Sequence, residues 1–217
     1  MKWGEAKLIC LQTMFANEGP ALTENDSNRD YLYAMPGKAN EAMMQLSLVG
    51  RPILKEAKIA VGVEDEDAAV SLEALGEGEI PHALALKEKL PDFRALHQLM
   101  LDSHGIYGDA EEYRVVGDDV LVLPGDVAGV YTVIYKAYPT PVSRDTADET
   151  VLDVHEECAS LVPLYMAAEL YKDDDLALAT VLRNEYEDGL QKIRAAWTES
   201  GGGGCAVAMR RNTTGWW

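Results

Sequence analysis

The sequence predicts an α+β protein: a helical bundle formed by the N- and C-terminal helices, with an inserted β-rich, sandwich-like domain and a flexible C-terminal arm. Near both ends of the chain, apolar residues recur at three- and four-residue steps, which indicates amphipathic helices. The middle is richer in Gly, Pro and β-branched residues, which is typical of strands and turns. Four consecutive glycines near the end predict a flexible linker. The expected domains are a helical domain of residues 1–52 and 142–197, a β-rich insert of residues 53–141 and an arm of residues 198–217.

The first helix is predicted from Trp3 to Ala16, where the apolar residues follow a helical spacing. Gly19-Pro20 ends it. A second helix is predicted after the polar stretch of residues 23–27, which offers several capping side chains. Its expected apolar face consists of Tyr31, Met35, Met43, Leu46 and Val49.

Pro36-Gly37 interrupts this second pattern, so we expect a kink or two shorter helices there. Gly50-Arg51-Pro52 closes the segment. Met35, Met43 and Met44 suit either core packing or an adaptable interface, and the sequence leaves both interpretations open.

In the middle of the chain, residues 54–63 predict a strand, followed by an acidic surface loop at residues 64–67. Residues 112–116 and 120–123 flank a Gly-Asp-Asp turn, which predicts a β-hairpin. Residues 129–138 are apolar or aromatic on both alternating faces, which predicts a strand that is buried on both sides or lies in a sandwich. Phe93 to Leu101 fits either a helical turn or a strand.

A helical pattern returns from Glu149 to Leu170, with Pro163 inside it as either a boundary or a kink. Asp173-Asp174-Asp175 offers an N-cap and favourable charges for a last helix. That helix is predicted to run to about Trp197. Beyond the glycines, we expect the arm to make protein–protein contacts through four residues: Arg210, Arg211, Trp216 and Trp217.

Charge and cysteine content exclude several classes of protein. The chain has 37 acidic and 19 basic residues, giving a formal net charge of −18, which disfavours nucleic-acid readers and binding to anionic membranes. Three cysteines without CxxC spacing argue against a disulfide framework and a zinc site. The start, residues 1–5, has no apolar region of a signal peptide, and no apolar run approaches a membrane span, so we expect a soluble protein made in the cytoplasm.

A search for catalytic patterns favours a protein that is not an enzyme and that needs no metal and no cofactor. The sequence lacks GxSxG, a Walker loop, GxGxxG after a strand and HExxH. His155-Glu156-Glu157-Cys158 contains ligand-type residues, but neighbours on a helix point in different directions. Asp173-Asp174-Asp175 lacks the spacing of a calcium loop. Acidic pairs at residues 111–112 and 118–119 are ordinary in surface turns.

Two segments carry a resemblance to a known family. Residues 29–42 (RDYLYAMPGKANEA) resemble a stretch of phage and prophage virion proteins in which "YL…MP…NEAL" leads into a long helix. Residues 161–170 (LVPLYMAAEL), followed by residues 173–175 (DDD) and 183–187 (RNEYE), are similar to the ending of head–tail adaptor and connector proteins of tailed bacteriophages. The strand at residues 131–135 and Pro139 also match that pattern. The similarity covers most of residues 1–197.

The resemblance implies a structural virion protein of the head–tail neck, made in the cytoplasm of the bacterial host. In this family a helical bundle docks on the portal ring and extends the DNA channel, usually with twelve copies per ring. The implied partners are other copies of the chain, the portal protein, a tail protein or the next adaptor, and passing DNA without sequence-specific binding. No membrane partner is implied. The β-rich insert and the Gly-rich end with its Trp pair depart from the pattern.

Two other functions remain open from the sequence. A carbohydrate-binding module, or another tail-associated binding module, could use the β-rich insert to display its tyrosines. A hydrolase with paired carboxylates is the third hypothesis. Virion incorporation would separate the adaptor from both, and glycan binding would favour the second.

Overall fold

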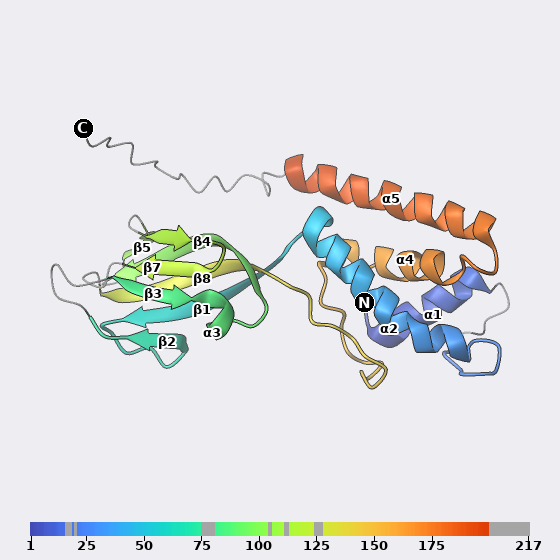
Figure 1. Ribbon diagram of the computed structural model, residues 1–217, viewed down its shortest axis with the longest axis horizontal. Coiled ribbons are helices and arrows are strands. Elements are labelled where there is room, and N and C mark those ends of the chain that lie inside the picture. The colour runs from blue at the N-terminus through green and yellow to red at the C-terminus, as the bar shows by residue number, and fades with distance from the viewer. Residues whose placement is uncertain are drawn as a thin grey trace. The chain divides into compact units, whose positions relative to one another are not determined.

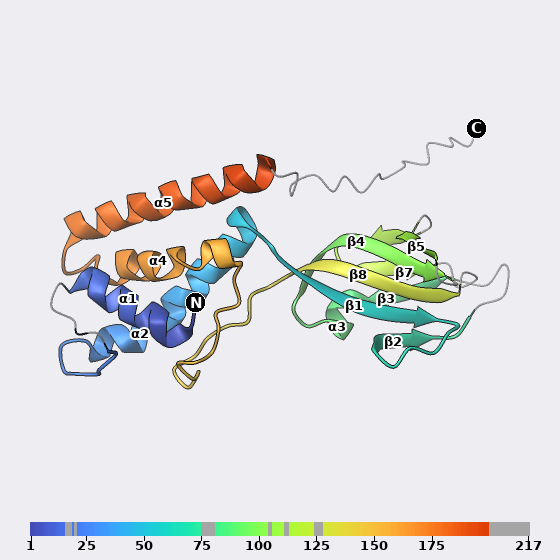
Figure 2. The same cartoon turned by 180° about the vertical axis from the view of Figure 1, so that it is seen from behind.

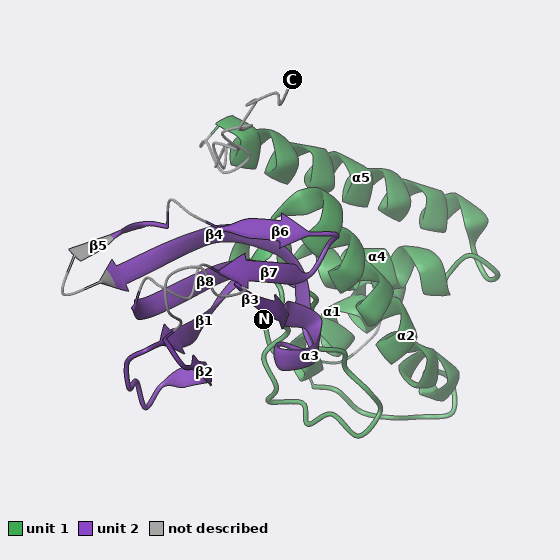
Figure 3. Cartoon of the chain, turned by 60° about the vertical axis from the view of Figure 1, so that its left-hand side comes forward, with its two compact units in different colours: residues 1–53, 138–200 green, residues 54–137, 201–217 purple. Residues whose placement is uncertain are grey.

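The α+β class is confirmed by the computed structural model, which contains helices and two β-sheets. The chain divides into two compact units, one of Met1–Ile53 with Tyr138–Ser200 and one that contains Leu54–Ala137 (Figure 3). The structure describes residues 1–15, 19, 21–74, 81–103, 106–110, 113–123 and 128–199.

The first unit, called the helical unit below, draws its elements from both ends of the chain (Figure 1). Its α4 is almost entirely buried and packs against α1, α2 and α5. A helix that is apolar all round is stable only inside such a bundle. The elements of this unit are α1 (Trp3–Met14), α2 (Arg29–Gln45), the π-helix η1 (Leu46–Gly50), the 3-10 helix η2 (Glu156–Cys158), α4 (Leu161–Leu170) and α5 (Leu176–Glu199).

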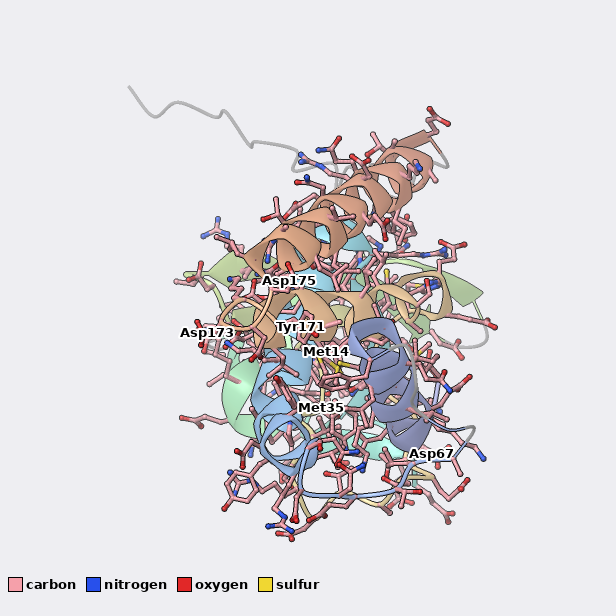
Figure 4. The ribbon with its side chains drawn as sticks, turned by 90° about the vertical axis from the view of Figure 1, so that its right-hand side faces the viewer. Met14, Met35, Asp67, Tyr171, Asp173 and Asp175 are labelled. Atoms are coloured by element: carbon pink, nitrogen blue, oxygen red, sulfur yellow. The ribbon has the colours of Figure 1, made fainter. Side chains whose placement is uncertain are left out.

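One hydrophobic core joins the two parts of the helical unit that are distant in sequence. Figure 4 shows Met14 of α1 and Met35 of α2 in its interior. Met35 and Met43 have no solvent exposure, whereas Met44 is half-buried. For Met35 and Met43, core packing is therefore the role that the structure supports.

The second predicted helix differs from expectation in two ways. Helix α2 runs through Pro36 as one element, so of the two expected alternatives, a kink or two shorter helices, the second is wrong. Pro36 and Met35 are both buried, and packing holds the helix together where the proline removes an intrahelical hydrogen bond. The expected apolar face is also wrong at Val49, which is 46% exposed because the last turn is a π-helix.

The helix predicted from Glu149 begins only at Leu161, so this prediction is wrong for residues 149–160. Backbone groups in the earlier part pair with the start of α1 instead. The carbonyl of Thr150 accepts from the Trp3 amide at 2.7 Å, and Val151 forms an isolated β-bridge with Lys2. Pro163 falls in the first turn of α4, where it marks a helix boundary.

The second unit, called the β unit below, contains a five-stranded sheet in the order β2-β1-β8-β4-β5 and a three-stranded sheet in the order β3-β7-β6 (Figures 1 and 2). β2 pairs with β1 in parallel, whereas β4 pairs with β5 and β8, and β7 with β3 and β6, in antiparallel fashion. Its elements are β1 (Ile53–Val61), β2 (Ala68–Leu72), β3 (His82–Ala85), α3 (Leu86–Lys89), β4 (Phe93–Ser103), β5 (Ile106–Asp109), β6 (Arg114–Val116), β7 (Val120–Leu123) and β8 (Gly129–Ala137).

Several strand predictions are confirmed. The hairpin of β6 and β7 turns at Gly117, whose φ of 65° suits glycine. Strand β8 lies between β1 and β4, with one face buried and the other only partly covered, so the strand is confirmed but full burial on both faces is not. The ambiguous segment from Phe93 forms strand β4. The acidic residues 64–67 lie in the loop between β1 and β2.

Candidate functional site

The candidate site lies at the contact between α2, α4 and α5. Here residues 29–42 meet residues 161–170 and 183–187, the segments that carry the family resemblance and are called the family-like segments below. Helices α4 and α5 approach closely because Gly189 of α5 faces Leu161 of α4. A Cβ atom at position 189 would lie 2.6 Å from Leu161 Cδ2. This close contact brings the polar residues of α4 and α5 within reach of α2.

A chain of side-chain hydrogen bonds links the three helices. The Tyr186 hydroxyl of α5 donates to Gln45 Oε1 of α2 at 3.1 Å. The Gln45 amide then donates to the Tyr165 hydroxyl of α4 at 3.3 Å. Tyr165 in turn donates to Glu41 Oε2, one helical turn earlier on α2, at 3.3 Å. Each polar atom of this chain has a partner, so the buried tyrosines are accommodated without an unsatisfied group.

Arg183 of α5 joins this cluster through hydrogen bonds and ring contacts. Its guanidinium donates to Glu187 Oε1 on the same helix at 2.6 and 2.9 Å and to Glu169 Oε1 of α4 at 3.1 Å. It also lies 5.1 Å from the ring centroid of Tyr165 and 5.4 Å from that of Tyr186. The two rings meet edge to face at 5.0 Å. One arginine thus joins two carboxylates and two aromatic rings.

Burial and charge set the ionisation of the cluster. Burial raises the pKa of Tyr186 far above its ordinary value, although the neighbouring Arg183 lowers it in part. Burial and then the charge of Glu169 raise the pKa of Tyr165. Both hydroxyls are therefore neutral donors at ordinary pH. They hold helices together and are poor candidates for acid–base chemistry.

The first family-like segment, on α2, also contacts residues that precede and follow α4 in the chain. Asn40 donates to the Val142 carbonyl at 2.9 Å and accepts from the Val142 amide at 2.8 Å. Tyr31 donates a hydrogen bond to Asp174, in the turn between α4 and α5. The residues that carry the resemblance are thus used to pack α2, α4 and α5.

The acidic triplet of residues 173–175 has a capping role. The Leu178 amide donates to Asp175 Oδ1 at 3.0 Å, which caps α5 as the sequence predicts. Figure 4 shows Asp173 and Asp175 near Tyr171, at the turn between α4 and α5.

The ligand-type residues at 155–158 do not gather into a metal site, although His155 Nδ1 lies 4.0 Å from Glu157 Oε2. His155 caps η2 by accepting from the Glu157 amide at 3.4 Å, and Glu157 pairs with Arg51 at 2.6 Å. The Cys158 side chain is buried in the core. In the described part of the chain, no group of three His, Cys, Asp or Glu side chains is placed to hold a metal ion.

Other sequence candidates lie apart from this cluster. Asp118 and Asp119 lie in the turn between β6 and β7. Residues 111–112 and the predicted interface residues of the arm, Arg210, Arg211, Trp216 and Trp217, fall outside the described residues. Among the helices that the structure describes, none is long and apolar enough to cross a membrane.

Sequence reasoning missed the cluster itself. It placed positions 165 and 186 only within two predicted helices. The available signal was the i, i+4 pair of Arg183 and Glu187 beside Tyr186, on a helix otherwise buried along one face. No protein-family model matches this sequence, and a search of the curated proteins found no match.

Proposed function

We propose that this chain is a structural subunit of a tailed-bacteriophage particle, a head–tail adaptor that docks on the portal ring and extends the DNA channel toward the tail. The observation that carries this proposal is the meeting of the family-like segments in one cluster, from Glu41 to Tyr165, Arg183 and Tyr186. Motifs whose residues lock helices together are expected in a family defined by assembly and not by catalysis.

The proposed architecture is a helical bundle with a sandwich-like insert. Two observations support it: one core joins residues before and after the β unit, and buried residues come from both sheets of that unit. In this arrangement the bundle is the docking body and the β unit is an addition. The proposed likeness of this chain to adaptors therefore rests on the helical bundle alone.

Charge supports a role beside passing DNA. The helical unit has 20 acidic and 10 basic residues, and residues 54–137 have 17 acidic and 7 basic residues, so both compact units are strongly acidic. A channel that carries DNA must not bind it tightly, and an acidic wall repels phosphates at short range. We propose that the adaptor forms a ring, with twelve copies as the family resemblance implies, in the neck of the virion.

The C-terminal arm is proposed to contact a neighbouring subunit, the portal or a tail protein through Arg210, Arg211, Trp216 and Trp217. Tryptophan and arginine dominate the energetics of many interfaces. Weak anchoring by one arm would become strong when repeated around a ring.

The test is assembly of the full chain with the portal protein encoded by the same phage genome. We expect ring-shaped particles in electron micrographs of the mixture and co-migration of the two proteins in sedimentation. A Tyr186→Ala variant, which opens the helix cluster, should lose co-migration. The matched variant Asn184→Ala, at an exposed position on the same helix, should keep it. A full-length folded chain that neither forms rings nor binds portal would contradict the proposal.

The two tyrosines on the central strand of the β unit give the carbohydrate-binding alternative no support. Tyr131 and Tyr135, on its central strand, are buried at 1% and 5% exposure and so cannot stack on a sugar. A glycan panel tested with the full chain would reveal binding by another surface.

A further inference from the structure

Strand β2 has an open edge. It lies at one side of the five-stranded sheet, and β1 is the only described strand that pairs with it (Figures 1 and 3). Edge strands are usually protected from pairing with other chains by charged side chains, by proline or by a bulge. β2 has a bulge at Ala69, but its sequence, AAVSL, contains no charged residue and no proline. This edge is therefore only partly protected.

The other three edges of the two sheets are shorter where the structure describes them, and each carries an ionisable residue. β3 has four residues and begins with His82, β5 has four residues and ends with Asp109, and β6 has three residues and begins with Arg114. Among the described edge strands, β2 is thus the longest, with five residues, and the only one without an ionisable side chain.

The hydrogen bonds of β2 show which backbone groups point outward. The Leu72 carbonyl accepts from the Gly62 amide at 2.9 Å, so the backbone groups of Leu72 point to the side of β1. Consecutive residues of a strand direct these groups to opposite edges, so those of Ser71 point away from β1. The register shift leaves Ala69 without a partner on β1. Both residues are exposed, and in the described part of the chain no other strand pairs with them.

Acidic residues stand at both ends of this edge. The segment from the β1–β2 loop to the residue after β2, EDEDAAVSLE, contains five acidic residues and no basic one. Lys58 neutralises two of them in part, since its Nζ lies 3.7 Å from Asp65 and 3.5 Å from Asp67. Glu66 and Glu73 are exposed and have no ion-pair partner among the described residues. Lys or Arg at each end of an added strand would therefore favour its binding.

We infer that the outer edge of β2 binds an extended segment of a partner protein, with an uncharged β-forming centre and Lys or Arg at both ends. The main chain of this segment pairs with Ala69 and Ser71, as in other cases of strand addition. A second copy of β2 fits poorly. In the antiparallel register that places Ala69 opposite Ser71, Asp67 of each copy would lie opposite Glu73 of the other, and directly opposed like charges destabilise a sheet.

The probe is a fluorescein-labelled, amidated nonapeptide, Lys-Arg-Val-Thr-Val-Thr-Val-Arg-Lys, whose binding to the full-length protein is followed by fluorescence anisotropy. The order of its residue types is the same in both directions, so its basic ends meet the acidic ends of β2 in either orientation. We expect saturable binding. A second peptide with proline in place of both threonines keeps every positive charge but loses two amide donors, and should bind at least about tenfold more weakly.

Two changes in the protein test the edge and its charge separately. Ser71→Pro removes an outward amide without removing a hydrogen bond to β1, and should weaken binding at least about tenfold, whereas Ser71→Thr keeps the amide and should bind normally. Glu66→Lys with Glu73→Lys should also weaken binding at least about tenfold, through lost attraction. The matched variant Glu185→Lys with Asp188→Lys makes the same change of net charge on exposed residues of α5, and should change the affinity by less than about threefold.

Three results would each overturn the inference: no binding of the nonapeptide, equal binding of the peptide with two prolines, or an affinity unchanged by the double substitution at positions 66 and 73. An unchanged affinity of Ser71→Pro, with the circular dichroism of the natural protein, would do the same. If Ser71→Pro does not fold, the other measurements still decide.

Self-association of the full chain would be a different outcome. If sedimentation shows self-association that Ser71→Pro abolishes, a second copy occupies the edge and the inference is wrong. The peptide measurements need neither a ring nor a portal protein, so their result is independent of the proposed role in the phage neck.

Discussion

At the scale of single residues, the side-chain amide of Asn40 pairs with the backbone of Val142 as a neighbouring strand would. It satisfies both the carbonyl and the amide of Val142, which is 6% exposed. Asn40→Ala should lower the free energy of unfolding by about 2 kcal/mol, because two hydrogen bonds are lost and buried backbone groups remain unpaired. Urea titration of the helical signal measures this loss. Asn184→Ala, at an exposed position on α5, is the control and should change stability by less than about 0.5 kcal/mol.

Two glycines should respond to alanine in opposite directions. At Gly129, in β8, a Cβ atom would lie 2.5 Å from the Asp102 carbonyl oxygen, so Gly129→Ala should destabilise by about 1–3 kcal/mol. At Gly37, on the exposed side of α2, nothing lies within 4 Å. Gly37→Ala should stabilise by up to about 1 kcal/mol through helix propensity. Denaturant unfolding of both variants distinguishes these signs, and a stabilising Gly129→Ala would contradict the packing described for β8.

Tyr135 makes the β unit sensitive to high pH. Burial and then its hydrogen bond to Asp92, 3.0 Å long, raise the pKa of its hydroxyl to about 12. The unfolded chain loses this proton near pH 10, whereas the folded chain keeps it. Stability from this group is therefore present below about pH 10 and declines as the pH rises toward about 12.

Unfolding at a series of pH values between about 8 and 12 measures this decline. Tyr135→Phe should be less stable at neutral pH, by about 1 kcal/mol for the lost hydrogen bond. Its decline above pH 10 should be shallower than that of the natural protein. Tyr33→Phe, at a residue 60% exposed, provides the control. An unchanged slope in Tyr135→Phe would show that another group causes the decline.

At the scale of a single element, the start of α5 depends on Asp175. Its side chain accepts from the Leu178 amide at 3.0 Å, one of the amides that the helix itself cannot satisfy. Asp175→Ala should cost about 1 kcal/mol of stability, measured by thermal unfolding. Asp173→Ala, two residues earlier on an exposed side chain, serves as the comparison. Equal losses of stability in the two variants would show that negative charge near the start of α5 stabilises the helix, and not the hydrogen bond of Asp175 to the Leu178 amide.

Elements with strong local patterns could be predicted from the sequence, and those set by distant partners could not. The β6–β7 hairpin and β8 carry their own turn and alternation signals. Residues 149–160 have helical spacing, yet their backbone pairs with Lys2 and Trp3, far away in sequence. The helix was a reasonable local expectation, and long-range pairing overrode it.

The candidate site shows the same limit. The sequence marked the segments of Tyr165 and Tyr186 through their resemblance to a family, and α5 was predicted as a helix. What could not be predicted is that Gln45 lies between the two hydroxyls, since that requires the α2–α4–α5 packing. Likewise, Val49 was expected in the core because the spacing of α2 contains no sign of a π-turn.

At the scale of the whole molecule, the two units should fold separately. Among the residues that the structure describes, the core of the helical unit draws on those before Ile53 and after Tyr138 and on none between them. Replacing residues 54–137 with a short Gly-Ser linker should leave a helical protein that melts cooperatively. Circular dichroism and calorimetry measure both properties.

The isolated segment of residues 54–137 is the companion experiment and should give a β-rich spectrum with its own transition. A helical remainder that is soluble but melts without cooperativity would show that the β unit contributes to the packing of the bundle. The Asn40→Ala substitution in the linked version should lower its melting temperature as it does in the full chain.

The pairing of Lys2 with Val151 has a consequence for synthesis on the ribosome. The first helices to emerge cannot complete their core until α4 follows, after the whole β unit has been made. At about 5–20 residues per second, this wait lasts on the order of ten seconds. The β unit, although second in the chain, is the first that can finish folding. During the delay the apolar faces of α1 and α2 lack their partners, so the nascent chain is the stage at which chaperones have the most to protect.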